Sequence, residues 1–191
     1  MRKAPHSLIA LYDANPEHAH FESPILSAKA RALGTALGKA GLWIVARIGS
    51  PIVGNVLSAL SDTAGLSVLL SPAATRMEHE NAYRLPFFEH PIIFTGRGAL
   101  GTDTIALSSA SAVIIFGSYP EVLENILECA QDCRLPIAVL TDEDPTDIHE
   151  RIRAVYPHLT AQLLVSHDPQ ILVHEIADEL RRRQLEQKLS K

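Results

Sequence analysis

With 191 residues, 47% of them hydrophobic, the chain is long and apolar enough to form one ordinary domain over residues 1–191 rather than a disordered segment. Its net charge of -5 is modest and both signs are spread along the sequence, so a basic patch is missing and we predict no nucleic-acid partner. No apolar run reaches the ~18 residues of a membrane span, and the first run, residues 7–12, is too short for a signal-peptide core, so we predict a cytoplasmic protein that binds no membrane.

The first third of the chain alternates short apolar runs with amphipathic stretches. Apolar runs that are rich in β-branched residues and too short for helices predict strands, whereas apolar residues at intervals of three and four predict helices. Gly41 and Gly65 follow the two helical stretches as C-caps do, and Pro51 suits the first position of the second helix. The predicted strands are residues 7–12, 42–48 and 67–70, and the predicted helices are residues 25–39 and 51–64.

Residues 73–91 show no clear period. They carry several charged side chains and Asn81 before a pair of phenylalanines. We predict a long functional loop here, lying over one edge of the sheet.

The stretch from Ile92 to Glu124 organises the rest of the chain. Two uncharged runs, Ile92–Phe94 and Ala112–Phe116, predict strands covered on both faces. A glycine-rich turn follows each strand, at residues 96–101 and 117–120, and a helix follows each turn. Both turns therefore lie at the carboxyl edge of a parallel sheet, where open α/β sheets bind ligands. Helix N-termini there favour an anion such as a phosphate.

The last third of the chain continues the alternation. A helix is predicted from Pro120, a strand over residues 136–140, an acidic loop over 141–147, a helix over 148–156, a strand over 162–165 and a final helix from Pro169. The whole pattern predicts an α/β fold of the Rossmann-like, doubly wound kind, with a mostly parallel sheet of about seven strands and helices on both faces.

Two groups of residues invite a cofactor or metal assignment that their surroundings do not support. Residues 96–101 match G-x-G-x-x-G between a strand and a helix, but the next strand does not end in the acidic residue that holds a dinucleotide ribose. His18 and His20 have no third ligand at suitable spacing, and Cys129 and Cys133 are expected to be reduced packing thiols. We therefore predict neither a bound cofactor nor a metal.

Several segments between Ser7 and Leu140 resemble the LOG-like proteins, the "lysine decarboxylase-like" or SLOG superfamily. This superfamily also holds cytokinin-activating phosphoribohydrolases and molybdenum-cofactor carrier proteins. The order of the elements is similar throughout. The segments that carry the resemblance are Leu42-Trp43-Ile44-Val45, residues 63–68, Asn81, Ile93-Phe94-Thr95-Gly96 and Ser109-Ala110-Ser111-Ala112-Val113-Ile114.

The resemblance assigns functional positions, and the chain departs from several of them. The family signature P-G-G-x-G-T-x-x-E places its glutamate on Glu124, but Pro120 and Glu121 stand where the family has Gly-Thr. The position of the family's catalytic arginine and its neighbour falls on Thr102-Asp103. A proline and an acidic side chain at a helix start also weaken phosphate binding there.

The candidate catalytic residues are Glu124 and Arg97. Arg97, five residues before the expected arginine, either reaches the site from its loop or is a solvated surface residue. Glu124 is either a site carboxylate or a partner of the helix dipole. The candidate ligand-binding residues are Gly96, Gly98, Gly101, Thr102, Asp103, Gly117, Ser118, Tyr119, Glu121, Asn81 and, in the remnant of a second family glycine motif, Gly49 and Ser50.

We therefore expect a LOG-like Rossmann domain that binds a nucleotide-like or other phosphate-bearing small molecule without hydrolase activity. One alternative is a nucleoside 5'-monophosphate phosphoribohydrolase that uses Glu124 and Arg97. Another is a molybdenum-cofactor carrier or a regulatory protein, including an inactive subunit beside an active relative. The resemblance also implies a homodimer.

Overall fold

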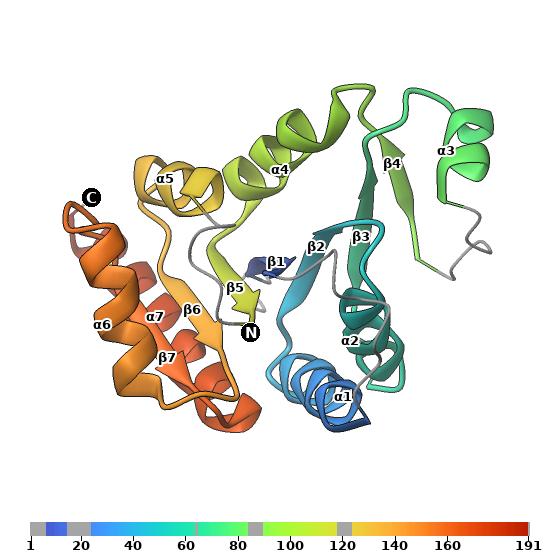
Figure 1. Ribbon diagram of the computed structural model, residues 1–191. Helices are drawn as coiled ribbons and strands as arrows, with labels where there is room; N and C mark the ends of the chain where they lie inside the picture. Colours follow the sequence, from blue (N-terminus) through green and yellow to red (C-terminus); the bar gives the residue numbers. More distant parts are fainter. Residues whose placement is uncertain (1–6, 15–23, 64, 84–89, 118–123, 191) are drawn as a thin grey trace.

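The computed structural model describes residues 7–14, 24–63, 65–83, 90–117 and 124–190, in which strands and helices alternate (Figure 1). The strands are β1 (Leu8–Asp13), β2 (Trp43–Arg47), β3 (Ser67–Ser71), β4 (Ile92–Phe94), β5 (Ala112–Phe116), β6 (Ile137–Leu140) and β7 (Leu163–Ser166). The helices are α1 (Pro24–Lys39), α2 (Pro51–Ser61), α3 (Arg76–Tyr83), α4 (Gly98–Ser109), α5 (Glu124–Asp132), α6 (Pro145–Val155) and α7 (Pro169–Leu189).

All seven strands form one sheet in the order β4-β3-β2-β1-β5-β6-β7, and every neighbouring pair is parallel. The chain begins at the central strand β1, winds outward to β4, crosses back to β5 and winds outward again to β7. This arrangement confirms the predicted doubly wound parallel sheet. Because the strands are parallel, all their carboxyl ends lie at one edge.

Helices cover both faces of the sheet because the strand side chains alternate between two cores. Ile9 and Leu11 pack with α1, α2 and α7 on one face, whereas Ala10 and Tyr12 pack with α4, α5 and α6 on the other. A strand that is apolar on both faces is what a parallel sheet covered by helices requires. The helices therefore form two layers, one over each face of the sheet.

The two strands of the organising stretch differ in a way that corrects the prediction. All five residues of β5 are buried, as expected. By contrast β4 lies at the edge of the sheet, and Ile93 is 53% exposed. β4 is only three residues long and pairs with β3 alone, so it is not covered on both faces. The Gly96 turn therefore follows an edge strand rather than a central one.

Residues 73–91 are not a continuous loop, because α3 occupies Arg76–Tyr83. The Glu78 N–H donates to Thr75 Oγ1 at 3.2 Å, and the Ala74 N–H donates to Glu78 Oε2 at 2.8 Å. These two bonds satisfy N–H groups around the first turn, much as a capping box does. The helix has a single fully buried residue, His79, so its sequence carries no apolar period.

Two helices also begin at residues that differ from the prediction. α6 begins at Pro145, inside the predicted acidic loop, because Asp144 accepts a hydrogen bond from the Thr146 N–H at 2.8 Å and caps the helix. α4 begins at Gly98, so Gly98 and Gly101 belong to a helix rather than to a turn. The helix start predicted at Pro120 lies outside the described residues. Over the described ranges, no helix is both long enough and apolar enough to cross a membrane.

Candidate functional site

A cavity of about 430 Å³ lies at the carboxyl edge, where β1 and β2 end. The first turn of α2, the first half of α4 and the start of α5 complete its walls. We call it the carboxyl-edge cavity. Its polar lining residues are Tyr12, Asp13, Arg47, Ser50, Tyr83, Asp103, Thr104 and Asn125.

The turn between β2 and α2 forms one wall of the cavity. Gly49 has a φ of +125°, a conformation that side-chain-bearing residues rarely adopt, and this allows the chain to turn sharply into the helix. Ser50 then caps α2, and Pro51 opens it. The Ser50 hydroxyl donates to Asp13 Oδ2 at 2.6 Å, so the end of β1 is joined to the start of α2.

An ion pair crosses the cavity wall between β2 and α4. Arg47 Nε donates to Asp103 Oδ1 at 2.9 Å, with side-chain exposures of 33% for Arg47 and 14% for Asp103. The Tyr12 hydroxyl donates to the backbone oxygen of Asp103 at 3.0 Å, which holds the second turn of α4 against β1. This tyrosine is neutral, because its pKa is raised by burial and by the nearby Asp103 carboxylate.

Burial also raises the pKa of Asp103 above its usual range, against the opposing effect of the Arg47 charge and hydrogen bond. Arg47 is the only cationic side chain among the described residues that line the cavity, and the same lining holds the carboxylates Asp13 and Asp103. Its Nε is bound to Asp103, and its Nη groups make no hydrogen bond to other described residues. A guanidinium placed in this way suits an oxyanion.

A smaller apolar pocket of about 190 Å³ adjoins the cavity at the start of α2. It shares Gly49 and Ser50 with the cavity and adds Leu57 and Leu69. A ligand with an anionic end and an apolar part therefore finds both kinds of surface within one site.

Three of the predicted ligand-binding residues, Gly49, Ser50 and Asp103, line the cavity. Thr102 is fully buried instead. Its hydroxyl is 2.6 Å from the Gly98 oxygen, to which it donates, and 2.7 Å from Thr95 Oγ1. Thr102 therefore fastens α4 to the end of β4.

The other predicted residues lie outside the described lining of the cavity. Gly96, Arg97 and Gly98 are exposed at the start of α4, Asn81 is exposed on α3, and Glu124 is exposed at the first position of α5, next to the lining residue Asn125. Gly101 packs under Arg97, where a β-carbon would come within 2.7 Å of the Arg97 side chain. Gly117 ends β5 with a φ of +108°. Ser118, Tyr119 and Glu121 lie outside the described residues, and the roles assigned to all these positions remain predictions.

The predicted site residues do not include four residues that line the cavity, Arg47, Asp13, Tyr12 and Tyr83. Arg47 and Asp13 are the last residues of neighbouring strands, and each is the first charged residue after an apolar run. A charged residue at that position was a usable signal, because strand ends at the carboxyl edge point toward the ligand side of an α/β sheet.

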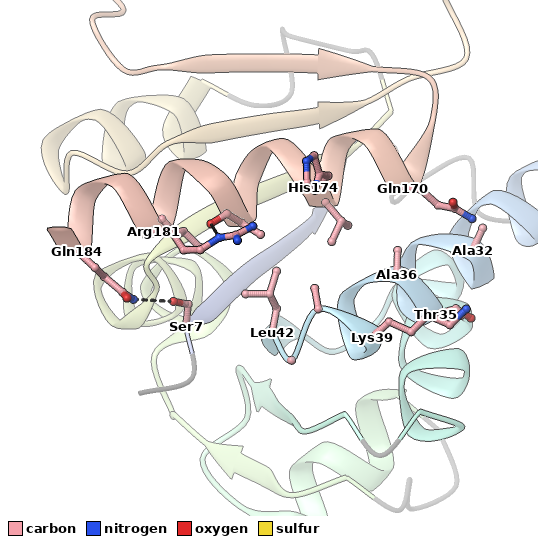
Figure 2. A pocket seen from close by; sticks show the side chains of 15 residues that line it. Ser7, Ala32, Thr35, Ala36, Lys39, Leu42, Gln170, His174, Arg181 and Gln184 are labelled. Carbon is pink, nitrogen blue, oxygen red and sulfur yellow. Dashed lines mark hydrogen bonds between the residues drawn. The ribbon is translucent and has the colours of Figure 1, made fainter. Parts of the chain in front are cut away.

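A larger hollow of about 920 Å³ runs between α1 and α7, and we call it the α1–α7 groove. Figure 2 shows it extending from Gln170 and Ala32 at one end to Gln184 and Ser7 at the other, where the Gln184 amide donates to the Ser7 hydroxyl at 3.4 Å. Its floor includes the small residues Ala32, Ala36, Ala40, Gly41 and Ala177.

Arg181 and His174 of this groove share one acidic partner, whereas Lys39 lines the groove without an ion pair among the described residues. Asp178 pairs with Arg181 and lies 3.3 Å from His174 Nε2. The groove also ends at Ser7 and Leu42, the residues just before β1 and β2, on the amino side of the sheet. Ligands of open α/β sheets bind at the opposite edge, so we take the smaller carboxyl-edge cavity as the candidate site.

The fold and this cavity define a Rossmann-like α/β protein with a site at the carboxyl edge of its central strands. Neither a family model nor the sequence of a curated protein matches the chain. Solved structures do match, and they share the Rossmann-like α/β fold.

The molybdenum cofactor carrier protein of Chlamydomonas reinhardtii is 15% identical over 91% of this chain and 97% of its own, with a TM-score of 0.65. The molybdenum cofactor binding protein of Rippkaea orientalis is 18% identical over 94% of this chain and 98% of its own, with a TM-score of 0.64. DNA processing protein A of Helicobacter pylori, described with a single-stranded DNA binding mode, is 15% identical over 91% of this chain and 81% of its own, with a TM-score of 0.56. At these identities the similarity establishes the fold alone.

Proposed function

We propose that the protein binds and carries a phosphate-bearing heterocyclic small molecule in the carboxyl-edge cavity, and that the molybdenum cofactor is the first candidate cargo. The observation that carries the proposal is Arg47, a lone guanidinium with available donors beside the turn that opens α2. Such a group binds a phosphate oxygen in a bidentate manner. The similarity to two molybdenum-cofactor proteins across nearly the whole chain supports this choice of cargo.

Binding without hydrolysis agrees with the chemistry of the cavity. Ser50 is hydrogen-bonded to a carboxylate, as a nucleophile would be, but Pro51 follows it and has no N–H to stabilise an oxyanion. Glu124 and Arg97, the residues that a phosphoribohydrolase of the LOG type would use here, are exposed and lie outside the described lining. A homodimer remains part of the proposal on family resemblance.

The test is retention of cargo. The protein is purified without oxygen from a bacterial host that makes the molybdenum cofactor, and bound molybdenum and pterin are measured by mass spectrometry and by fluorescence after oxidation. We expect the wild-type protein to retain both and Arg47→Gln to lose both. Arg31→Gln is the matched control, because Arg31 is an exposed arginine on α1, 3.9 Å from Asp62.

The same preparations are screened with nucleoside monophosphates and sugar phosphates by thermal unfolding. A ligand at one hundred times its dissociation constant raises the free energy of unfolding by about 2.7 kcal/mol. If the protein retains a nucleotide but no molybdenum, the proposed cargo is wrong and the proposed site still holds. Loss of cargo in Arg97→Gln but not in Arg47→Gln would move the anion position to the start of α4 and overturn the proposed site.

A further inference from the structure

We propose that Asp103 occupies the anion position of Arg47 until a ligand displaces it, so that the cavity selects dianions over monoanions and takes up a proton when a dianion binds. The inference rests on the proposed function and concerns the same cavity. It assigns a residue that sets specificity and defines the charge of the group that the ligand must present.

The displacement of Asp103 from Arg47 requires only a side-chain movement. Asp103 is the sixth residue of α4, and the Tyr12 hydroxyl holds its backbone oxygen at 3.0 Å. The backbone is therefore fixed from β1, and only the carboxylate has to rotate away from Arg47 Nε. Arg47 is one-third exposed to the cavity, so an incoming anion reaches the guanidinium without opening the fold.

The charge balance decides which anions benefit. A monoanion that replaces the Asp103 carboxylate gains no charge over the group that it displaces. A dianionic tetrahedral group brings a second negative charge to the guanidinium and offers it two oxygens. A ligand with a phosphate monoester therefore gains from the exchange, whereas a carboxylate ligand does not.

The displaced Asp103 carboxylate is the group that takes up the proton when a dianion binds. Once rotated, Asp103 lies beside a dianion and no longer has its cation, and a like charge nearby favours the neutral form. Burial already raises the pKa of Asp103 in the ligand-free protein, which is the same direction as the change that a nearby dianion causes. The other titratable groups that line the cavity are Tyr12 and Asp13 on β1, Tyr83 on α3 and Cys129 on α5, and no histidine lines the cavity among the described residues.

The experiment uses inorganic sulfate and methanesulfonate as probes. Both are tetrahedral and keep one charge state between pH 5 and 8, as a dianion and a monoanion respectively, so any pH dependence belongs to the protein. Binding is followed by NMR titration at constant ionic strength, and proton uptake by calorimetry in buffers of different ionisation enthalpy. The proteins are wild type, Asp103→Asn, Arg47→Gln and the control Asp142→Asn, whose carboxylate pairs with Lys29 and does not line the cavity.

We expect wild type to bind sulfate more tightly than methanesulfonate and to bind it more tightly as the pH falls, by at most about tenfold per pH unit for one proton. Asp103→Asn should bind sulfate about tenfold more tightly at pH 8 and lose the pH dependence, since a like charge has been removed. Arg47→Gln should not bind, and Asp142→Asn should behave as wild type. Asp103→Ser repeats the test if the asparagine variant does not fold.

Each outcome separates this inference from the proposed function. Equal or weaker sulfate binding by Asp103→Asn, with binding by wild type intact, overturns the displacement by Asp103 and leaves the cavity as an anion site. A preference for methanesulfonate overturns the selection for dianions. If neither wild type nor Asp103→Asn binds sulfate, and wild type also retains no phosphate-bearing cargo, the proposed function fails and the inference fails with it.

Discussion

The carboxyl-edge cavity and the α1–α7 groove differ in size, in their position on the sheet and in the charged groups that line them. In the groove, Asp178 pairs with both Arg181 and His174, whereas Lys39 makes no ion pair with a described residue. In the cavity, Arg47 has one bond to Asp103, and its Nη groups have no partner among the described residues. The groove is about twice as large, at about 920 Å³ against about 430 Å³, but it lies toward the amino side of the sheet, away from the edge where open α/β sheets bind ligands.

A second contrast separates Arg47 from the arginines of the amino edge. Arg182 and Arg183 both donate to Glu179, whose side chain is 4% exposed, at distances of 2.5 to 2.8 Å. The hydrogen bond from Arg182 leads the effects that lower the pKa of Glu179. These arginines hold α7 together, whereas Arg47 is available to a ligand. The two kinds of arginine predict opposite phenotypes.

The largest effect should follow Glu179→Gln. Removing the charge weakens the hydrogen bonds from two partly exposed arginines to a buried side chain, and losing hydrogen bonds to a charged group costs about 2 kcal/mol of unfolding free energy. Urea unfolding measures the loss. The wild-type contribution is complete above the ordinary glutamate pKa and disappears as the pH falls through the lower pKa of the folded state, so the variant should show a flatter acid profile.

Ligand retention is the control for this variant. Because Glu179 is remote from the carboxyl-edge lining, the folded fraction of Glu179→Gln should bind cargo as wild type does. A loss of cargo without a loss of stability would show that the amino edge contributes to binding, and the contrast between the two kinds of arginine would be wrong.

The next effect compares the two hollows directly by filling each with a tryptophan. Thr104 is an exposed residue of α4 that lines the cavity, and Ala32 is an exposed residue of α1 that lines the groove. We expect Thr104→Trp to weaken cargo binding at least tenfold, about 1.4 kcal/mol, because the indole occupies ligand space. Ala32→Trp should leave the affinity unchanged. The opposite pattern in calorimetric titrations would make the groove the binding site.

The fold was predictable because its signal is local and repeated. The uncharged run Ala112–Phe116 specifies a strand that is buried on both faces, and the structure buries all five of its residues. The short run Ile92–Phe94 has the same sequence pattern and predicts the same kind of strand, but it lies at the edge of the sheet. Its position could not be predicted because strand order is set by long-range packing. In α3 only His79 is fully buried, so the sequence of this helix has no apolar period from which it could be predicted. The pair Thr75-x-x-Glu78 was the available signal, because it resembles a capping box at a helix start.

The site was harder to predict because it combines residues that only the strand order brings together. Arg47 and Asp103 are 56 positions apart, and their contact requires that α4 cross back over β2 on its way from β4 to β5. The glycine motif at residues 96–101 drew attention to the start of α4, where Gly98 and Gly101 serve the helix itself. The prediction that the chain binds no nucleic acid likewise stands untested beside its similarity to DNA processing protein A.

The smallest expected effect compares two helix caps, one beside each hollow. Thr75 Oγ1 accepts from the Glu78 N–H at the start of α3, whose last residue Tyr83 lines the cavity. Asp168 Oδ1 accepts from the Gln170 N–H at 2.7 Å at the start of α7, which forms the groove. Replacing either cap by alanine should cost about 1 kcal/mol of unfolding free energy, measured in urea.

The two cap variants should then differ in binding. Loosening α3 disturbs the position of Tyr83, so Thr75→Ala should bind cargo a few-fold more weakly than wild type, a change smaller than the tenfold that corresponds to about 1.4 kcal/mol. Loosening α7 leaves the cavity walls intact, so Asp168→Ala should match wild type in affinity while matching Thr75→Ala in stability. Because the stability loss is the same in both, any difference in cargo affinity reports which hollow the ligand occupies. Equal weakening in both variants would mean that affinity follows global stability rather than the geometry of the cavity.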